Sequence, residues 1–180
     1  GLVYQPIQDK LALYANYLNG FVFLDPAVVA DPDGKNITIQ PFEPEQANQF
    51  EIGTKANLWN GRLTTSLSYY HIDVYNKLMT DMENMHGFKQ GGKARSKGVE
   101  ISITGSPLKG WNIITGFSHN NSKVTKSQEA DGNLGYRPEE AGPANSFNLW
   151  TNYQIQSGAL KELSLGFGLN AVSSNKVINR

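Results

Sequence analysis

Three side chains that could bind a metal ion lie close together near the middle of the chain. Asp81, Glu83 and His86 occupy one short polar segment, which also contains all three methionines. Carboxylate and imidazole groups are common metal ligands, but a metal site also needs fixed geometry and a supporting shell of hydrogen bonds. Nothing in the surrounding sequence indicates such a shell. We therefore expect a loop here and no metal site.

The segment that follows nearly matches a phosphate-binding loop. In residues 87–94, GFKQGGKA, the spacing of Gly87, Gly92 and Lys93 fits, but Ala94 stands where Ser or Thr would bind magnesium. A phosphate-binding loop also needs a buried strand before it and a helix after it, and the sequence pattern indicates neither. We interpret the segment as a flexible loop.

The composition argues against several classes of protein. The chain has 180 residues, 16 basic and 16 acidic, and the resulting zero net charge argues against nucleic-acid binding. It has no cysteine, which removes disulfides, thiolate metal sites and cysteine nucleophiles. No arrangement of Ser, His and Asp, and no pair of carboxylates, indicates catalysis. We expect a protein that is not an enzyme and needs no cofactor.

Apolar residues recur at every second position through most of the chain. Phe50, Ile52 and Leu58, for example, alternate with polar residues such as Glu51 and Lys55. Side chains of a strand alternate between its two faces, so each such segment has one apolar and one polar face. The pattern predicts an all-β chain. It is found in residues 11–17, 50–58, 99–104, 111–117, 146–155 and 163–171.

A further strand, predicted within residues 62–76, changes phase along its length. Leu67 and Tyr69 fall on one face, whereas Tyr70, Ile72 and Val74 fall on the other. The change after Tyr69 indicates either a β-bulge or a strand that passes from one environment into another.

Short and long connections alternate between these strands. The short ones are residues 5–9, 58–61, 106–110 and 157–161, and the long ones are residues 19–42, 76–93 and 122–143. Antiparallel neighbours joined in this way place all short turns at one end. The pattern is typical of an antiparallel up-and-down meander, about eight strands of a larger transmembrane β-barrel. A soluble β-sandwich is the alternative, but polar faces rich in Asn, Ser and Gly favour a wet lumen.

Several motifs in this order resemble one family, the TonB-dependent outer-membrane receptors, and in particular the siderophore receptors. Residues 44–81 contain a Pro-Glu, a Glu-x-Gly-x-Lys strand, an Asn-Gly turn and a strand ending in Tyr70, Ile72 and Asn76. Residues 93–124 contain an Arg-Ser-x-Gly-Val-Glu strand and a Gly-Trp-Asn hairpin, with Phe117 where the family usually has Tyr. Residues 137–155 contain a Leu-Trp-Thr-x-Tyr strand preceded by a proline.

The resemblance implies an importer in the outer membrane of a Gram-negative bacterium. In that family a C-terminal barrel of about 22 strands encloses a plug, and a periplasmic TonB energy-coupling protein pulls on a segment ahead of the plug. Residues 1–180 would form part of this barrel domain, and we expect the plug and the end of the chain to lie outside this sequence. The implied partners are a ferric siderophore, outer-membrane lipid and TonB, with no nucleic acid.

Three alternatives to siderophore import stay open at this point. The receptor could import another nutrient, such as a vitamin cofactor or an oligosaccharide. The chain could also be a soluble β-sandwich binding module, such as a lectin, or an intact small barrel with a structural role.

The aromatic residues have two possible roles. Eight lie toward predicted strand ends, where aromatic girdles form at membrane interfaces. These are Tyr17, Tyr69, Tyr70, Tyr75, Trp111, Phe117, Trp150 and Tyr153. A ring such as that of Trp150 could instead face the lumen and contact a ligand. From their place in a long external loop alone, Tyr136 and Arg137 are the residues that we expect to contact the ligand.

Overall fold

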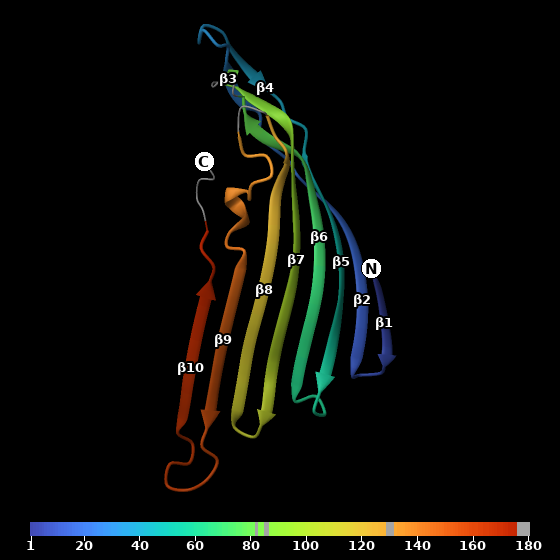
Figure 1. Ribbon diagram of the computed structural model, residues 1–180, viewed down its shortest axis with the longest axis vertical. Coiled ribbons are helices and arrows are strands. Elements are labelled where there is room, and N and C mark those ends of the chain that lie inside the picture. Colours follow the sequence, from blue (N-terminus) through green and yellow to red (C-terminus); the bar gives the residue numbers. More distant parts are fainter. Residues whose placement is uncertain (82, 85–86, 129–131, 176–180) are drawn as a thin grey trace.

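A computed structural model of the chain describes residues 1–81, 83–84, 87–128 and 132–175. Its main element is an eight-stranded sheet in the order β1-β2-β5-β6-β7-β8-β9-β10, and β3 and β4 form a separate hairpin (Figure 1). The strands are β1 (Leu2–Ile7), β2 (Leu11–Val22), β3 (Ala27–Ala30), β4 (Ile37–Gln40), β5 (Glu45–Leu58), β6 (Leu63–Thr80), β7 (Phe88–Leu108), β8 (Trp111–Lys126), β9 (Asn145–Gln154) and β10 (Ser164–Val172), with a 3-10 helix, η2 (Glu139–Ala141), before β9.

Neighbouring strands of the main sheet are all antiparallel and, apart from the inserted β3–β4 hairpin, follow one another in chain order. The connections β1–β2, β5–β6, β7–β8 and β9–β10 lie at one end, and the connections β2–β5, β6–β7 and β8–β9 lie at the other (Figure 1). The predicted all-β meander of about eight strands is therefore confirmed.

One face of the sheet carries a continuous band of exposed apolar side chains. Seven that share this face are Leu13, Ile52, Leu67, Ile101, Phe117, Leu165 and Phe167, each at least 40% exposed. Among the described residues, prolines aside, only Leu63 and Ala94 are buried apolar side chains, so this sheet does not cover a hydrophobic core. A sandwich needs a second sheet packed over such a face, and the described part of the chain provides none.

The upper edge of this band, toward the long loops, descends across the sheet. Residues paired across the strands form rows, and rows on the same face are two residues apart along each strand. The apolar band ends at Tyr17 on β2, at Tyr69 on β6 and at Phe117 on β8. Each of these lies one such row farther from the long loops than the one before. Strands that run at an angle to the band produce this stepwise shift, and strands of a barrel are inclined to its axis in the same way. The register therefore shows that the strands are inclined to the apolar band.

The opposite, polar face is built from small and polar residues with aromatic rings laid across glycines. Such rings occupy the space that the missing Cβ leaves and cover the exposed backbone. A Cβ added at Gly168, for example, would lie 2.9 Å from Cε3 of Trp150. The cross-strand pairs are Tyr14 with Gly53, Tyr70 with Gly98 and Trp150 with Gly168.

All three long predicted connections contain strand that the sequence pattern did not reveal, and in 122–143 it is the end of β8, which runs to Lys126. The stretch 19–42 contains the β3–β4 hairpin, and β6 and β7 extend into the predicted loop 76–93 as far as Thr80 and Phe88. Residues 88–94 thus form the start of β7, and the interpretation of 87–94 as a flexible loop is wrong for them. Cross-strand hydrogen bonding to β6 orders this glycine-rich segment.

The phase change in β6 is not a bulge after Tyr69. Pairing with β5 is continuous from Leu63 to Tyr75, so the strand passes from one environment into another without losing register. The irregularity lies farther on, between Val74 and Lys77, where Asn76 has a φ of 56°. Asn tolerates this left-handed conformation better than most residues.

Candidate ligand-binding face

The polar face carries a shallow groove of about 510 Å³ that crosses most of the sheet. Two carboxylates lie along it, Glu51 on β5 and Glu100 on β7. Oε1 of Glu51 accepts a hydrogen bond of 2.8 Å from the hydroxyl of Tyr14, whereas neither carboxylate has an ion-pair partner among the described residues. The groove is therefore polar, acidic and lined largely by hydroxyl and amide groups.

A hydrogen-bond network rises from this groove to the long loops. Asn120 on β8 donates to the hydroxyl of Tyr70 at 2.7 Å and to Oγ of Ser96 at 2.8 Å. Oγ of Ser122 donates to Oδ1 of Asn120 at 2.6 Å and lies at hydrogen-bond distance, 2.9 Å, from Oγ of Ser96. The network joins β6, β7 and β8, so it fixes the polar side chains at the top of the groove in one arrangement.

Arg137 extends this network into the β8–β9 loop. Its guanidinium donates to the carbonyl and side-chain oxygens of Asn120, at 2.7 and 2.9 Å. It also donates to the carbonyls of Gly142, Ala141 and Pro143, at 2.8, 3.1 and 3.1 Å. Hydrogen bonds from a charged donor are the stronger kind. Arg137 therefore holds the two sides of its loop together and against β8.

Tyr136 has different surroundings from its neighbour. Its side chain is 54% exposed, while its backbone carbonyl accepts a hydrogen bond of 2.8 Å from the amide of Val124. A fixed backbone that presents an exposed aromatic ring is suited to binding. The assignment of Tyr136 and Arg137 to ligand contact stays a prediction.

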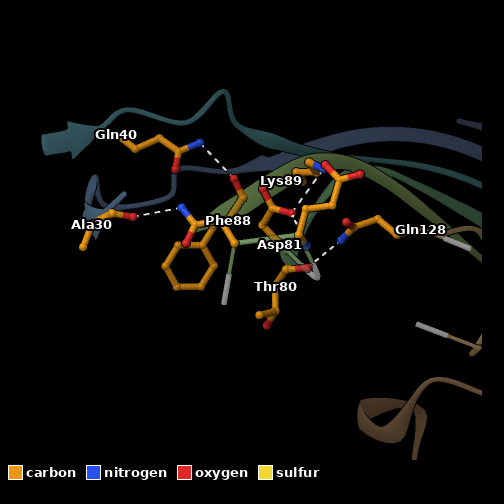
Figure 2. Close-up of polar contacts among 9 residues, drawn as sticks. Ala30, Gln40, Thr80, Asp81, Phe88, Lys89 and Gln128 are labelled. Carbon is orange, nitrogen blue, oxygen red and sulfur yellow. Dashed lines mark hydrogen bonds and ion pairs between the residues drawn. The ribbon is translucent and has the colours of Figure 1, made fainter. Parts of the chain in front are cut away.

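Asp81 forms a salt bridge with Lys89 (Figure 2). Nζ of Lys89 lies 3.1 Å from Oδ1 of Asp81 and 2.7 Å from Oε2 of Glu83. A hydrogen bond from the Glu83 amide, aided by Lys89, holds the pKa of Asp81 below its usual value, and the two carboxylates raise the pKa of Lys89. His86 lies outside the described residues, which contain no group of three metal-ligating side chains.

Hydrogen bonds join the long connections to one another around the tips of β6 and β7 (Figure 2). Nε2 of Gln40 on β4 donates to the carbonyl of Phe88 at 2.9 Å, and Nδ2 of Asn84 donates to the carbonyl of Ala30 at 2.9 Å. From the β8–β9 loop, Nε2 of Gln128 donates to the carbonyl of Thr80 at 2.5 Å. The long connections therefore form one linked cluster above the groove.

The aromatic residues divide between the two faces. Tyr17, Tyr69 and Phe117 belong to the apolar face, which agrees with the girdle interpretation, whereas Tyr70 and Trp150 lie on the polar face. The phosphate-binding loop was correctly rejected, since its Lys93 belongs to β7 and stacks on the ring of Tyr75 at 5.2 Å. Within the described ranges no helix is long and apolar enough to cross a membrane.

Comparison with known proteins agrees with this architecture. Residues 1–179 match the family described as TonB dependent receptor-like, beta-barrel. The ferric-pyoverdine 358 receptor of Pseudomonas putida is 28% identical over 94% of this chain and 19% of its own length. The catecholate siderophore receptor Fiu of Escherichia coli K12 is 29% identical over 91% of this chain and 22% of its own length.

Solved structures of siderophore receptors superpose well on the sheet. BauA, the ferric preacinetobactin receptor of Acinetobacter baumannii, has a TM-score of 0.74 and 28% identity over 95% of this chain and 24% of its own. FpvA of Pseudomonas aeruginosa PAO1 bound to pyoverdine has a TM-score of 0.72 and 28% identity, over 92% of this chain and 23% of its own. The chain belongs to the TonB-dependent receptor β-barrel family, and it spans about a fifth of the length of these relatives.

Proposed function

We propose that this chain is part of the wall of an outer-membrane receptor that imports a ferric siderophore by TonB-energised transport, a transport role and not a catalytic one. The observation that carries the proposal is the division of one sheet into an exposed apolar band and a polar, grooved face. A barrel wall between lipid and an aqueous lumen needs this division. The siderophore is the proposed cargo because the relatives named above are receptors for ferric pyoverdine and for catecholate siderophores.

In this proposal the ligand enters from the side of the linked loops. Tyr136 offers an exposed ring there, and Arg137 keeps its loop in place. Hydrogen bonds that fix the loops before binding reduce the ordering cost of association. The loop cluster thereby supplies a binding surface above the groove.

The acidic groove is the surface that we propose meets the plug. Glu51 and Glu100 are carboxylates on a face that would line the lumen, and no cation of the described chain pairs with them. Basic side chains of a plug would compensate their charge. TonB would act on that plug and not on this wall.

The proposal is tested with the full-length receptor in its own cells. We expect a protein several times larger than 19.8 kDa in the outer-membrane fraction, whose deletion abolishes uptake of iron-55 from the cognate ferric siderophore. Replacing the siderophore with ferric citrate controls for general loss of iron uptake. A soluble protein refutes the membrane assignment, and unchanged siderophore uptake after deletion refutes the cargo.

A further inference from the structure

A group of basic side chains lies on the apolar face of the sheet, between the apolar band and the long loops: Lys97 follows Val99 directly on this face, whereas His119 and Asn121 separate Lys123 from Phe117. Arg95 and Lys97 on β7 alternate onto the same face as Val99, and Lys123 on β8 onto the same face as Phe117. All three basic residues are exposed. Arg95 and Lys123 are direct cross-strand partners, so their charges lie close together. We call Arg95, Lys97 and Lys123 the rim cluster.

The charges around the rim cluster leave it positive. Asp73 on β6 binds Nε of Arg95 at 2.6 Å and Nε2 of His71 at 3.0 Å. In the portion of the chain that the structure covers, neither Lys97 nor Lys123 has an ion-pair partner. The other titratable groups on this face of β6, β7 and β8 near the rim cluster are Tyr75, Lys93, His119 and Lys126, none of which is acidic.

Repulsion between the basic side chains of the rim cluster destabilises the sheet, and a bound anion would remove this repulsion. Like charges directly opposite each other on neighbouring strands destabilise a sheet, and Arg95 and Lys123 form such a pair. Asp73 offsets only one charge and is shared with His71. An anion held between β7 and β8 would therefore stabilise this part of the wall.

We propose that the rim cluster binds the phosphate groups of an outer-leaflet lipid, an inference that rests on the proposed outer-membrane location. Val99, which lies next below Lys97 on this face, and the rest of the apolar band would contact the acyl chains while Lys97 and Lys123 contact phosphate. Basic residues at a membrane surface attract anionic headgroups, and ammonium and guanidinium groups make strong hydrogen bonds to phosphate oxygens. The apolar band makes a lipid the occupant in preference to free phosphate.

The test measures binding of diphosphorylated lipid A to the full-length receptor purified in detergent, by native mass spectrometry. The double variant Lys97→Gln/Lys123→Gln should bind about fivefold more weakly for each lysine removed. Lys55→Gln, a control on the polar face, should bind like the wild type. Lipid A without phosphates should bind the wild type and the double variant equally and weakly.

The following outcomes would contradict binding of a lipid phosphate by the rim cluster. Equal affinity of the wild type and the double variant for diphosphorylated lipid A, an equal loss in Lys55→Gln, or tight binding of the dephosphorylated lipid would refute it. Displacement of the lipid by equimolar inorganic phosphate would assign the cluster to free phosphate. Migration of the unheated variants in a gel reports whether they are folded. If the double variant does not fold, the lipid A affinity of each single variant, Lys97→Gln and Lys123→Gln, is compared with that of the wild type.

Fractionation and siderophore uptake separate this inference from the proposed function. A receptor found outside the outer membrane refutes the proposed function whatever its lipid affinity. A receptor located there, importing its ligand, and unaffected in lipid binding by the double variant refutes only the lipid site.

Discussion

The hydroxyl of Tyr70 accepts a hydrogen bond of 2.7 Å from Asn120, and the ring of Tyr70 crosses Gly98 on the strand between them. The three residues occupy one cross-strand row of β6, β7 and β8. Since Asn120 also binds Arg137, this row connects the polar wall to the β8–β9 loop.

Gly98→Ala should destabilise the barrel by about 1–3 kcal/mol, the usual cost of overpacking. A methyl group there would overlap the Tyr70 hydroxyl and lie 2.5 Å from the carbonyl oxygen of His119. Gly20→Ala on β2 is the control, because a Cβ there meets nothing within 4 Å. Thermal unfolding of the full-length receptor in detergent measures both, and equal melting temperatures would contradict the prediction.

Tyr136→Ala should weaken binding of the ferric siderophore at least fivefold, since an important interface side chain contributes about 1 kcal/mol or more. Leu134→Ala is the matched control, as Leu134 lies in the same loop and is 60% exposed. Quenching of intrinsic fluorescence during titration gives both affinities. The contact assignment fails if Tyr136→Ala binds as tightly as its control.

Arg137→Gln should release the β8–β9 loop. Losing hydrogen bonds from a charged group costs about 1.5–3 kcal/mol, so amide exchange in residues 132–143 should accelerate at least tenfold. Tyr136→Ala should leave this exchange unchanged, because that residue is held through its backbone carbonyl. Unaltered exchange in Arg137→Gln would show that its hydrogen bonds do not order the loop.

The Asp81–Lys89 salt bridge should stabilise the β6–β7 connection only within a defined pH range. The pKa of Asp81 is lowered, so its contribution is present above the ordinary carboxyl pKa of about 4 and is lost as pH falls through the lower folded value. The pKa of Lys89 is raised, so its contribution is present below about pH 10 and is lost as pH rises through the higher folded value.

Protease cleavage within residues 81–89 measures this dependence when acid- and base-stable proteases are used. Asp81→Asn should reduce the acid-side change and leave the alkaline change, which Glu83 also supports. Cleavage in the wild type that stays constant from neutral pH until Asp81 is fully protonated would show that the salt bridge does not hold the connection.

Much of the fold could be predicted from the sequence because the pleat has a period of two and each strand separates two unlike environments. Residues such as Ile52 and Glu51 reveal their faces by alternation alone. The β3–β4 hairpin was missed because two four-residue strands are too short for a periodic signal. The relation of Tyr70 to Gly98 depends on strand register, which one sequence does not display.

The candidate site was less accessible to prediction for a similar reason. Loop position alone pointed to Tyr136 and Arg137, but the oxygens that Arg137 binds include backbone carbonyls. Carbonyls are present at every residue, so only folding determines which of them converge. The Glu-x-Gly-x-Lys and Gly-Val-Glu motifs do contain both groove carboxylates, Glu51 and Glu100, and spacing within each motif was the available signal.

The stepped edge of the apolar band, from Tyr17 through Tyr69 to Phe117, restricts where the chain can change length. Inserting two residues within a strand would preserve the alternation of its side chains between the two faces. It would, however, shift the apolar part of that strand by one same-face row relative to both neighbouring strands. Lengthening a long connection, which lies outside the apolar band, leaves the register of the strands within the band unchanged. In the proposed membrane wall, insertions in the long connections can therefore change the binding surface, while the strand lengths stay matched to the thickness of the bilayer.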